Sequence, residues 1–221
     1  MTQSSVRLKA GPLIAIGPYH LHYEPVNKRE NKGPRMSSQT SIPLLLLIDL
    51  QKGFDHPKWG ERNNPEFVKN AVKILTHWRA SGRPIIHVRH ASTEPGSPLS
   101  PDELGYEFYD WATPEEGEME VVKQVNSCFI GTGLSDQLKE RGLNELVVLG
   151  LTTNHCISTS VRMAGNLGFD VTLIGDACAT FPRRSPDGTE YSADLIHDTA
   201  LANLHGEFCT VSNTNDLINA Q

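Results

Sequence analysis

The sequence lacks any apolar run long enough for a membrane-spanning helix, which needs roughly 18 residues. Its most apolar stretch, residues 41–50, is much shorter and contains a carboxylate near its end. It also lacks a CxxC pair, although it contains four cysteines, and nothing in their spacing argues for disulfides. We therefore expect a cytoplasmic protein with reduced thiols and no membrane partner.

Common signatures of nucleotide and zinc sites are missing as well. Neither a P-loop nor a GxGxxG pattern follows the first apolar run, and there is no HExxH. The nine histidines form no tight ligand cluster with carboxylates, so we expect structural or surface roles for them. A Cys–His dyad through His90 or His155 stays open, although His155 should point away from its neighbour Cys156. We predict no metal site and no cofactor.

The charge is unevenly distributed along the chain. Residues 1–41 contain six basic and two acidic side chains, whereas the remainder contains 14 and 24. Such an acidic domain argues against nucleic acid as a partner. We expect residues 1–41 to form a flexible basic extension, with a weak targeting segment as the alternative and Met36 as an alternative natural start. Residues 42–221 are long enough for one domain.

Short apolar runs alternate with helical stretches in this domain. Continuous apolar character suits strands that are covered on both faces. The runs are residues 42–48, 84–88, 145–149 and 170–174, with shorter candidates at 121–122 and 207–211. Helical periodicity or composition marks residues 65–81, 134–141, 157–167 and 193–204. The alternation predicts an α/β fold with a doubly wound, mostly parallel sheet.

Residues 89–120 do not follow this alternation. They contain four prolines and three glycines and show little periodicity. A connection of this length is usually a lid or a binding loop, and a disordered insertion is the alternative. Aromatic side chains favour the lid because they supply surface for packing; they are Tyr106, Phe108, Tyr109 and Trp111.

Three unlike polar groups follow predicted strands. Asp49 and Lys123 each come directly after an apolar run, and Cys156 follows the run at 145–149 through a short loop. Singly, they could be a turn cap, a surface lysine and a buried filler. Together they should meet at the carboxyl edge of the sheet, where ligands collect. Cys156 also opens a predicted helix, whose dipole, with Lys123, should lower the thiol pKa and favour a nucleophile.

Four motifs resemble those of the isochorismatase-like cysteine hydrolases. They are "LLLLIDLQKGF", "VVKQVNSCFIGTGL", "VVLGLTTNHCISTSVRMAGNLGFDVTLIGDACAT" and "ALANLHGEFCTV". The resemblance implies a six-stranded sheet with helices on both faces, a catalytic triad of Asp49, Lys123 and Cys156, and self-association. It also implies a cis peptide between Leu151 and Thr152, and an oxyanion hole formed by the N–H groups of Thr152 and Cys156.

The resemblance leaves the small-molecule substrate open. Asp55 and His56 offer only part of the metal site found in nicotinamidases of the family, so metal-assisted hydrolysis is doubtful. We expect hydrolysis of a small amide or carbamoyl compound through a thioester, with isochorismate hydrolysis and a non-catalytic scaffold as alternatives. The residues expected to contact the substrate are Gln51, Phe54, Tyr106, Phe108, Asn126, Leu151 and Asn154.

Overall fold

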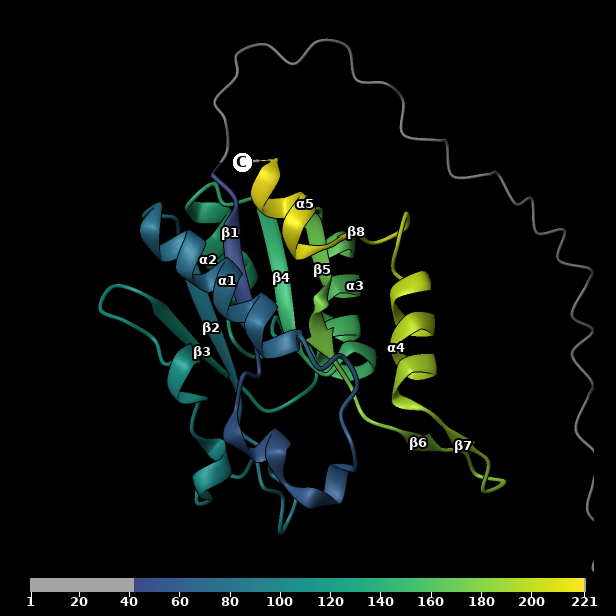
Figure 1. Ribbon diagram of the computed structural model, residues 1–221. Coiled ribbons are helices and arrows are strands. Elements are labelled where there is room, and N and C mark those ends of the chain that lie inside the picture. Colours follow the sequence, from purple (N-terminus) through teal and green to yellow (C-terminus); the bar gives the residue numbers. More distant parts are fainter. Residues whose placement is uncertain (1–41, 221) are drawn as a thin grey trace, which may run out of the picture. The chain divides into compact units, whose positions relative to one another are not determined.

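The computed structural model describes residues 42–220, and the expected basic extension lies outside this part. Within it, six strands form one sheet in the order β3-β2-β1-β4-β5-β8, and every neighbouring pair is parallel (Figure 1). The strands are β1 (Leu44–Ile48), β2 (Ile85–His90), β3 (Met119–Lys123), β4 (Glu145–Leu151), β5 (Asp170–Ala179) and β8 (Thr210–Ser212). The predicted α/β fold is confirmed.

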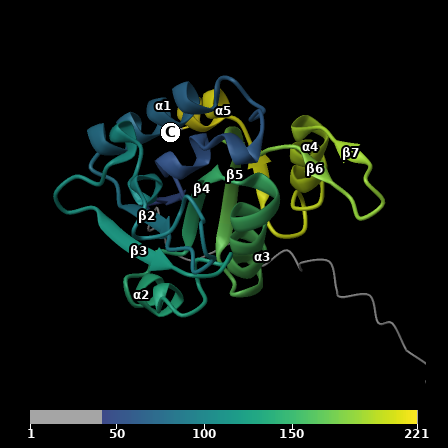
Figure 2. The ribbon, with the colours of Figure 1, turned by 90° about the horizontal axis from the view of Figure 1, so that it is seen from below.

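Helices cover both faces of this sheet. The helices α1 (Phe67–Ala80) and α5 (Thr214–Asn219) lie on one face, and α2 (Leu134–Glu140) and α3 (Ser158–Asn166) lie on the other (Figure 2). Beside the sheet are α4 (Ala193–Ala202) and a hairpin of β6 (Arg183–Arg184) and β7 (Glu190–Tyr191). The strand order reverses between β1 and β4, and open α/β sheets bind ligands at the carboxyl ends of such a pair.

The centre of the sheet is buried from both sides, which explains its continuous apolar runs. No residue of β1 is more than 1% exposed. Helix α1 packs the predicted apolar stripe against the sheet. The indole Nε1 of Trp78, which belongs to this stripe, donates to the carbonyl of Pro43 at 3.2 Å. Each large side chain buried in this way contributes about 1.5–3 kcal/mol. The stripe consists of Phe67, Ala71, Ile74, Leu75 and Trp78.

The C-terminal part differs most from the expected elements. The last strand is β8 rather than residues 207–211, because a turn precedes it in which the Gly206 N–H donates to the Cys209 carbonyl. The sequence pattern did not predict α5, a short helix that Asn213 caps by accepting from the Asp216 N–H. None of the helices in residues 42–220 has the length and apolar character that crossing a bilayer requires.

The connection between β2 and β3 is well packed. It contains two 3-10 turns, Leu104–Tyr106 and Asp110–Ala112. Its aromatic side chains pack as predicted: Tyr109 stacks on Trp111, with ring centroids 5.6 Å apart, and Trp111 meets Phe67 of α1 edge-on. These contacts anchor the segment to the domain.

Two glycines bring this connection close to the residues that follow β1. A Cβ built on Gly105 would lie 2.6 Å from the Cα of Gly53 and 2.2 Å from the carbonyl oxygen of Pro98. Real Cβ atoms do not approach backbone so closely, so a larger residue would have to displace the segment. The connection therefore covers the carboxyl end of β1.

Candidate active site

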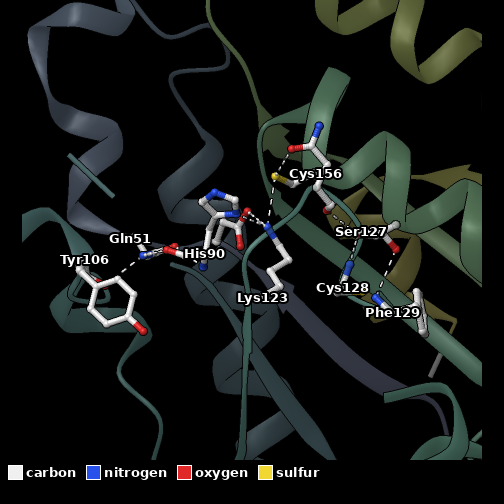
Figure 3. Close-up of polar contacts among 11 residues, drawn as sticks. Gln51, His90, Tyr106, Lys123, Ser127, Cys128, Phe129 and Cys156 are labelled. Atoms are coloured by element: carbon white, nitrogen blue, oxygen red, sulfur yellow. Dashed lines mark hydrogen bonds and ion pairs between the residues drawn. The ribbon is translucent and has the colours of Figure 1, made fainter. Parts of the chain in front are cut away.

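A buried ammonium group, the Nζ of Lys123, is the centre of the site. It lies at the carboxyl end of β3 and donates to Asp49 Oδ2 at 2.7 Å, His90 Nδ1 at 3.0 Å and Cys156 Sγ at 3.3 Å. These three acceptors match its three N–H groups. Figure 3 shows the contacts meeting at Lys123. The structure thus brings together the three residues predicted from the strand ends.

The strand order explains why His90 belongs to this cluster. β2 lies between β3 and β1, and its last residue, His90, is paired in register with Lys123. The Lys123 side chain therefore passes the end of β2 on its way to Asp49. Burial lowers the pKa of His90, and the Lys123 charge lowers it further. The ring is consequently neutral and accepts an N–H from Lys123 through Nδ1. The contact with Lys123 is a structural role for His90, in agreement with the expectation for the histidines.

Asp49 is held by backbone contacts as well as by Lys123. Its N–H donates to the Val88 carbonyl at 2.8 Å, and its φ of 55° lies in the left-handed region, which few non-glycine residues adopt. The side chain is fully buried. Its second oxygen, Oδ1, has no hydrogen-bond partner within residues 42–220. This oxygen is available to accept a proton.

Cys156 lies in a π-helical turn, Thr153–Ile157, that leads into α3. The preceding peptide bond Leu151–Thr152 is cis. The thiol is 7% exposed, and burial raises its pKa well above the ordinary value of 9.0. Asp49 raises the pKa further, whereas Lys123 lowers it. The expected net lowering is therefore wrong: the thiol is protonated at neutral pH and needs a base before it can attack.

The thiol lines a cavity of about 310 Å³, at the lower end of the range of small-molecule sites. Three other predicted site residues also line it: Phe54, Asn126 and Thr152. The Cys156 thiol donates to Asn126 Oδ1, which lies 3.8 Å from Sγ. The cavity can therefore present a small molecule directly to the sulfur.

Other residues predicted to contact the substrate have internal roles. The amide of Gln51 donates to the carbonyls of His90 and Tyr106, both at 3.0 Å, and accepts from the His90 N–H at 2.8 Å (Figure 3). Gln51 thus ties the β2–β3 connection to the end of β2. The rings of Tyr106 and Phe108 lie against the guanidinium of Arg89.

The last two predicted contacts also lie in the framework of the site. Leu151 is fully buried at the end of β4, and Asn154 Oδ1 accepts from the Thr180 hydroxyl. Leu151 precedes the turn that carries Cys156, and Asn154 belongs to that turn.

Several cavity residues were not predicted from the sequence. The β2–β3 connection contributes Ser92, Thr93, Glu94, Ser97 and Leu99, as its lid interpretation suggests, although no pattern singled out these positions. The other additions are Trp59, Gln124, Val125 and Arg183. The two histidines considered for a Cys–His dyad, His90 and His155, line the cavity as well. The Nη2 of Arg183 lies 3.3 Å from His155 Nδ1.

Within residues 42–220, one cluster of side chains could ligate a metal ion: Asp49, His90 and Cys156. Their ligand atoms lie within 4.8 Å of one another. The Lys123 ammonium already contacts all three and serves as the cation of this cluster. Asp55, considered from the sequence, instead accepts from the Tyr109 hydroxyl at 2.8 Å.

Comparison with known proteins gives consistent matches. The family model of the isochorismatase domain matches residues 43–216. The uncharacterized isochorismatase family protein YrdC of Bacillus subtilis is 46% identical over 79% of this chain and 94% of its own. A crystal structure from Chromobacterium violaceum, assigned to the same family, has a TM-score of 0.79 and 45% identity, covering 84% of this chain and 96% of that one. Ureidoacrylate amidohydrolase RutB of Caulobacter vibrioides is 29% identical over 78% of this chain and 68% of its own.

Proposed function

Because the chain belongs to the isochorismatase family of hydrolases, we propose that it cleaves the C–N bond of a small amide or carbamoyl compound. Cys156 is the nucleophile, and a thioester is the intermediate. The observation that carries this proposal is the contact of a buried Asp49–Lys123 pair with a thiol that lines a cavity. An amidohydrolase among the relatives supports the choice of bond.

Activation of the thiol is the first step. The carboxylate of Asp49 and the sulfur lie within 4.8 Å of each other, and the free oxygen Oδ1 can accept the thiol proton. The Lys123 ammonium contacts both groups and stabilises the thiolate as it forms. A base is required here, because burial keeps the pKa of Cys156 high.

Attack forms a C–S bond and moves the carbonyl π electrons onto oxygen. We assign the backbone N–H groups of Thr152 and Cys156 as donors to this oxyanion; both residues line the cavity. One such donor typically lowers the barrier by about 3–4 kcal/mol. The C=O bond then re-forms, the C–N bond breaks, and Asp49 returns its proton to the departing nitrogen.

Water completes the reaction. Asp49, again a carboxylate, takes a proton from a water molecule whose oxygen attacks the thioester carbonyl. The C–S bond breaks, the acid product leaves, and the sulfur regains its proton. His90 holds the third N–H of Lys123 throughout, so the ammonium keeps one orientation toward Asp49 and Cys156.

Ammonia release from a panel of small primary amides and ureides tests this proposal. We expect release by the wild type and none by Cys156→Ala. Cys209→Ala is the matched control, because its thiol lies directly before β8 and outside the residues that line the cavity. Mass spectrometry of a quenched reaction should show the acyl group on Cys156.

Two results would contradict the proposal. Turnover of isochorismate that survives in Cys156→Ala, without amide hydrolysis, would instead support vinyl ether cleavage. No turnover of any amide, ureide or isochorismate by folded protein would support a scaffold. Asp49→Asn should match Cys156→Ala in activity, since both remove the activated nucleophile.

A further inference from the structure

Arg183 occupies an anchored position at the wall of the cavity. It begins β6, two residues after Phe181, which is 2% exposed. The ring of Phe181 lies against those of Phe54 and Trp59, with centroids 6.3 and 6.1 Å away, and both of these rings line the cavity. The backbone that carries Arg183 is therefore fixed next to the aromatic side of the site.

The guanidinium of Arg183 is only partly satisfied within residues 42–220. Nη2 contacts Nδ1 of His155, the residue before the nucleophile, at 3.3 Å. Nε is buried without a hydrogen-bond partner, and no carboxylate of the described residues forms an ion pair with this side chain. Its neighbour Arg184, in contrast, is exposed and pairs with Glu190.

A partly buried guanidinium without a counter-ion is unfavourable until an anion reaches it. A carboxylate is the best match, since its two oxygens can accept two parallel N–H bonds from arginine. From this geometry we infer that Arg183 binds a carboxylate of the substrate while Cys156 attacks its amide or carbamoyl carbon. The substrate class, which rests on the proposed function, is then a small carboxylic acid that also carries an amide or ureido group.

The other charged and titratable groups at the cavity leave this assignment in place. The charge of Lys123 is matched by Asp49 at 2.7 Å. His90 and His155 are neutral, because burial lowers the pKa of each. Glu94 lines the cavity on an exposed stretch, where water screens its charge. Arg183 is thus the charged group of the wall with the most to gain from a substrate ion.

Two alkylating reagents of nearly equal size test the inference without a known substrate. Iodoacetate carries a carboxylate and iodoacetamide does not; in both, the Cys156 sulfur displaces iodide from a CH₂ group. We expect Arg183→Met to lower the rate constant for iodoacetate by about tenfold or more, and that for iodoacetamide by less than about threefold. Arg183→Lys should restore part of the iodoacetate rate, since it keeps the charge but loses the paired geometry.

Arg184→Met is the matched control and should leave both rate constants unchanged. Peptide mass spectrometry assigns the modification to Cys156. A ratio of the two rate constants that is the same in wild type and Arg183→Met would overturn the inference.

Hydrolysis supplies the second arm. Wild-type protein should release ammonia from succinamic acid with a kcat/KM about tenfold or more above that for neutral succinamide, and Arg183→Met should remove this preference mainly through KM. Cysteine-dependent hydrolysis of both compounds without preference would overturn the substrate class alone. Hydrolysis of neither would count against the proposed function, and the alkylation ratio would still decide the anion site.

Discussion

Replacing Lys123 with methionine should lower the free energy of unfolding by about 3–5 kcal/mol, because the Asp49 carboxylate would then be buried without its partner. Both side chains are fully buried, and Nζ lies 2.7 Å from Oδ2. At an effective dielectric constant of about 20, two unit charges at this distance attract by about 6 kcal/mol. Desolvation offsets part of this attraction, so removal of one partner should cost somewhat less than the attraction itself.

The double variant Asp49→Asn/Lys123→Met separates the pair from the packing of each side chain. Each single variant leaves one buried charge, whereas the double variant leaves none. We expect the double variant to lose at least about 1.5 kcal/mol less than the sum of the two single losses. Urea unfolding of all four proteins at pH 7, followed by circular dichroism, measures this coupling. Additive losses would refute the reasoning.

The pH dependence gives an independent check on the same pair. Burial acts to lower the pKa of Lys123, but Asp49 and Cys156 outweigh it, and the net pKa is raised above the ordinary 10.5. A raised lysine pKa stabilises the fold below the unfolded value, and this contribution is lost as the pH rises through the folded value. The deficit of Lys123→Met should therefore stay constant near neutral pH and shrink only above about pH 10.5.

Three further changes have defined outcomes. Glu118→Gln should lower the free energy of unfolding by about 1.5–3 kcal/mol near neutral pH. Burial raises the pKa of Glu118, but hydrogen bonds from Arg79 and His87 hold it at about 2, below the ordinary 4.5. Urea titrations should show this cost disappearing as the pH falls from about 4.5 to about 2. Gly105→Ala should lower the free energy of unfolding by about 1–3 kcal/mol and speed proteolysis of residues 91–118. Unchanged cleavage would contradict the close packing of Gly105 against Gly53 and Pro98. His90→Ala should lower kcat/KM about tenfold in steady-state assays, whereas His90→Asn, whose amide oxygen can accept the same N–H, should keep most activity; equal losses would count against its role.

Most of the strands and the cluster of Asp49, Lys123 and Cys156 were predictable from the sequence, and the buried strands for a clear physical reason. A strand covered on both faces must be apolar throughout, so a polar residue directly after it is conspicuous. Asp49 was found in this way. Lys123 ends the edge strand β3, whose burial alternates, and only the short apolar pair before it pointed to this residue. Cys156 followed from the loop after β4. The protonation state of the thiol was not predictable, because the expected effects of the helix end and Lys123 are local, whereas its burial depends on the whole domain.

His90 also lies at the carboxyl end of a strand, β2, yet its partner could not be identified from residue types. Only the order β3-β2-β1 makes the Lys123 side chain pass the end of β2. That order is set by pairing between segments far apart in the chain. Gln51 is a similar case: its contacts with His90 and Tyr106 join residues 39 and 55 positions away.

The two adjacent arginines show the limit most clearly, because they are chemically identical and neighbours in sequence. Successive residues of a strand point to opposite faces, so only one of the pair can line the cavity while the other faces solvent. The register Arg183↔Tyr191 and Arg184↔Glu190, together with the buried Phe181 two residues earlier, decides which one does. A shift of one residue in this register would exchange the two environments. Which arginine lines the cavity therefore depends on the register of a hairpin that only two residue pairs define. Residue types alone do not specify that register.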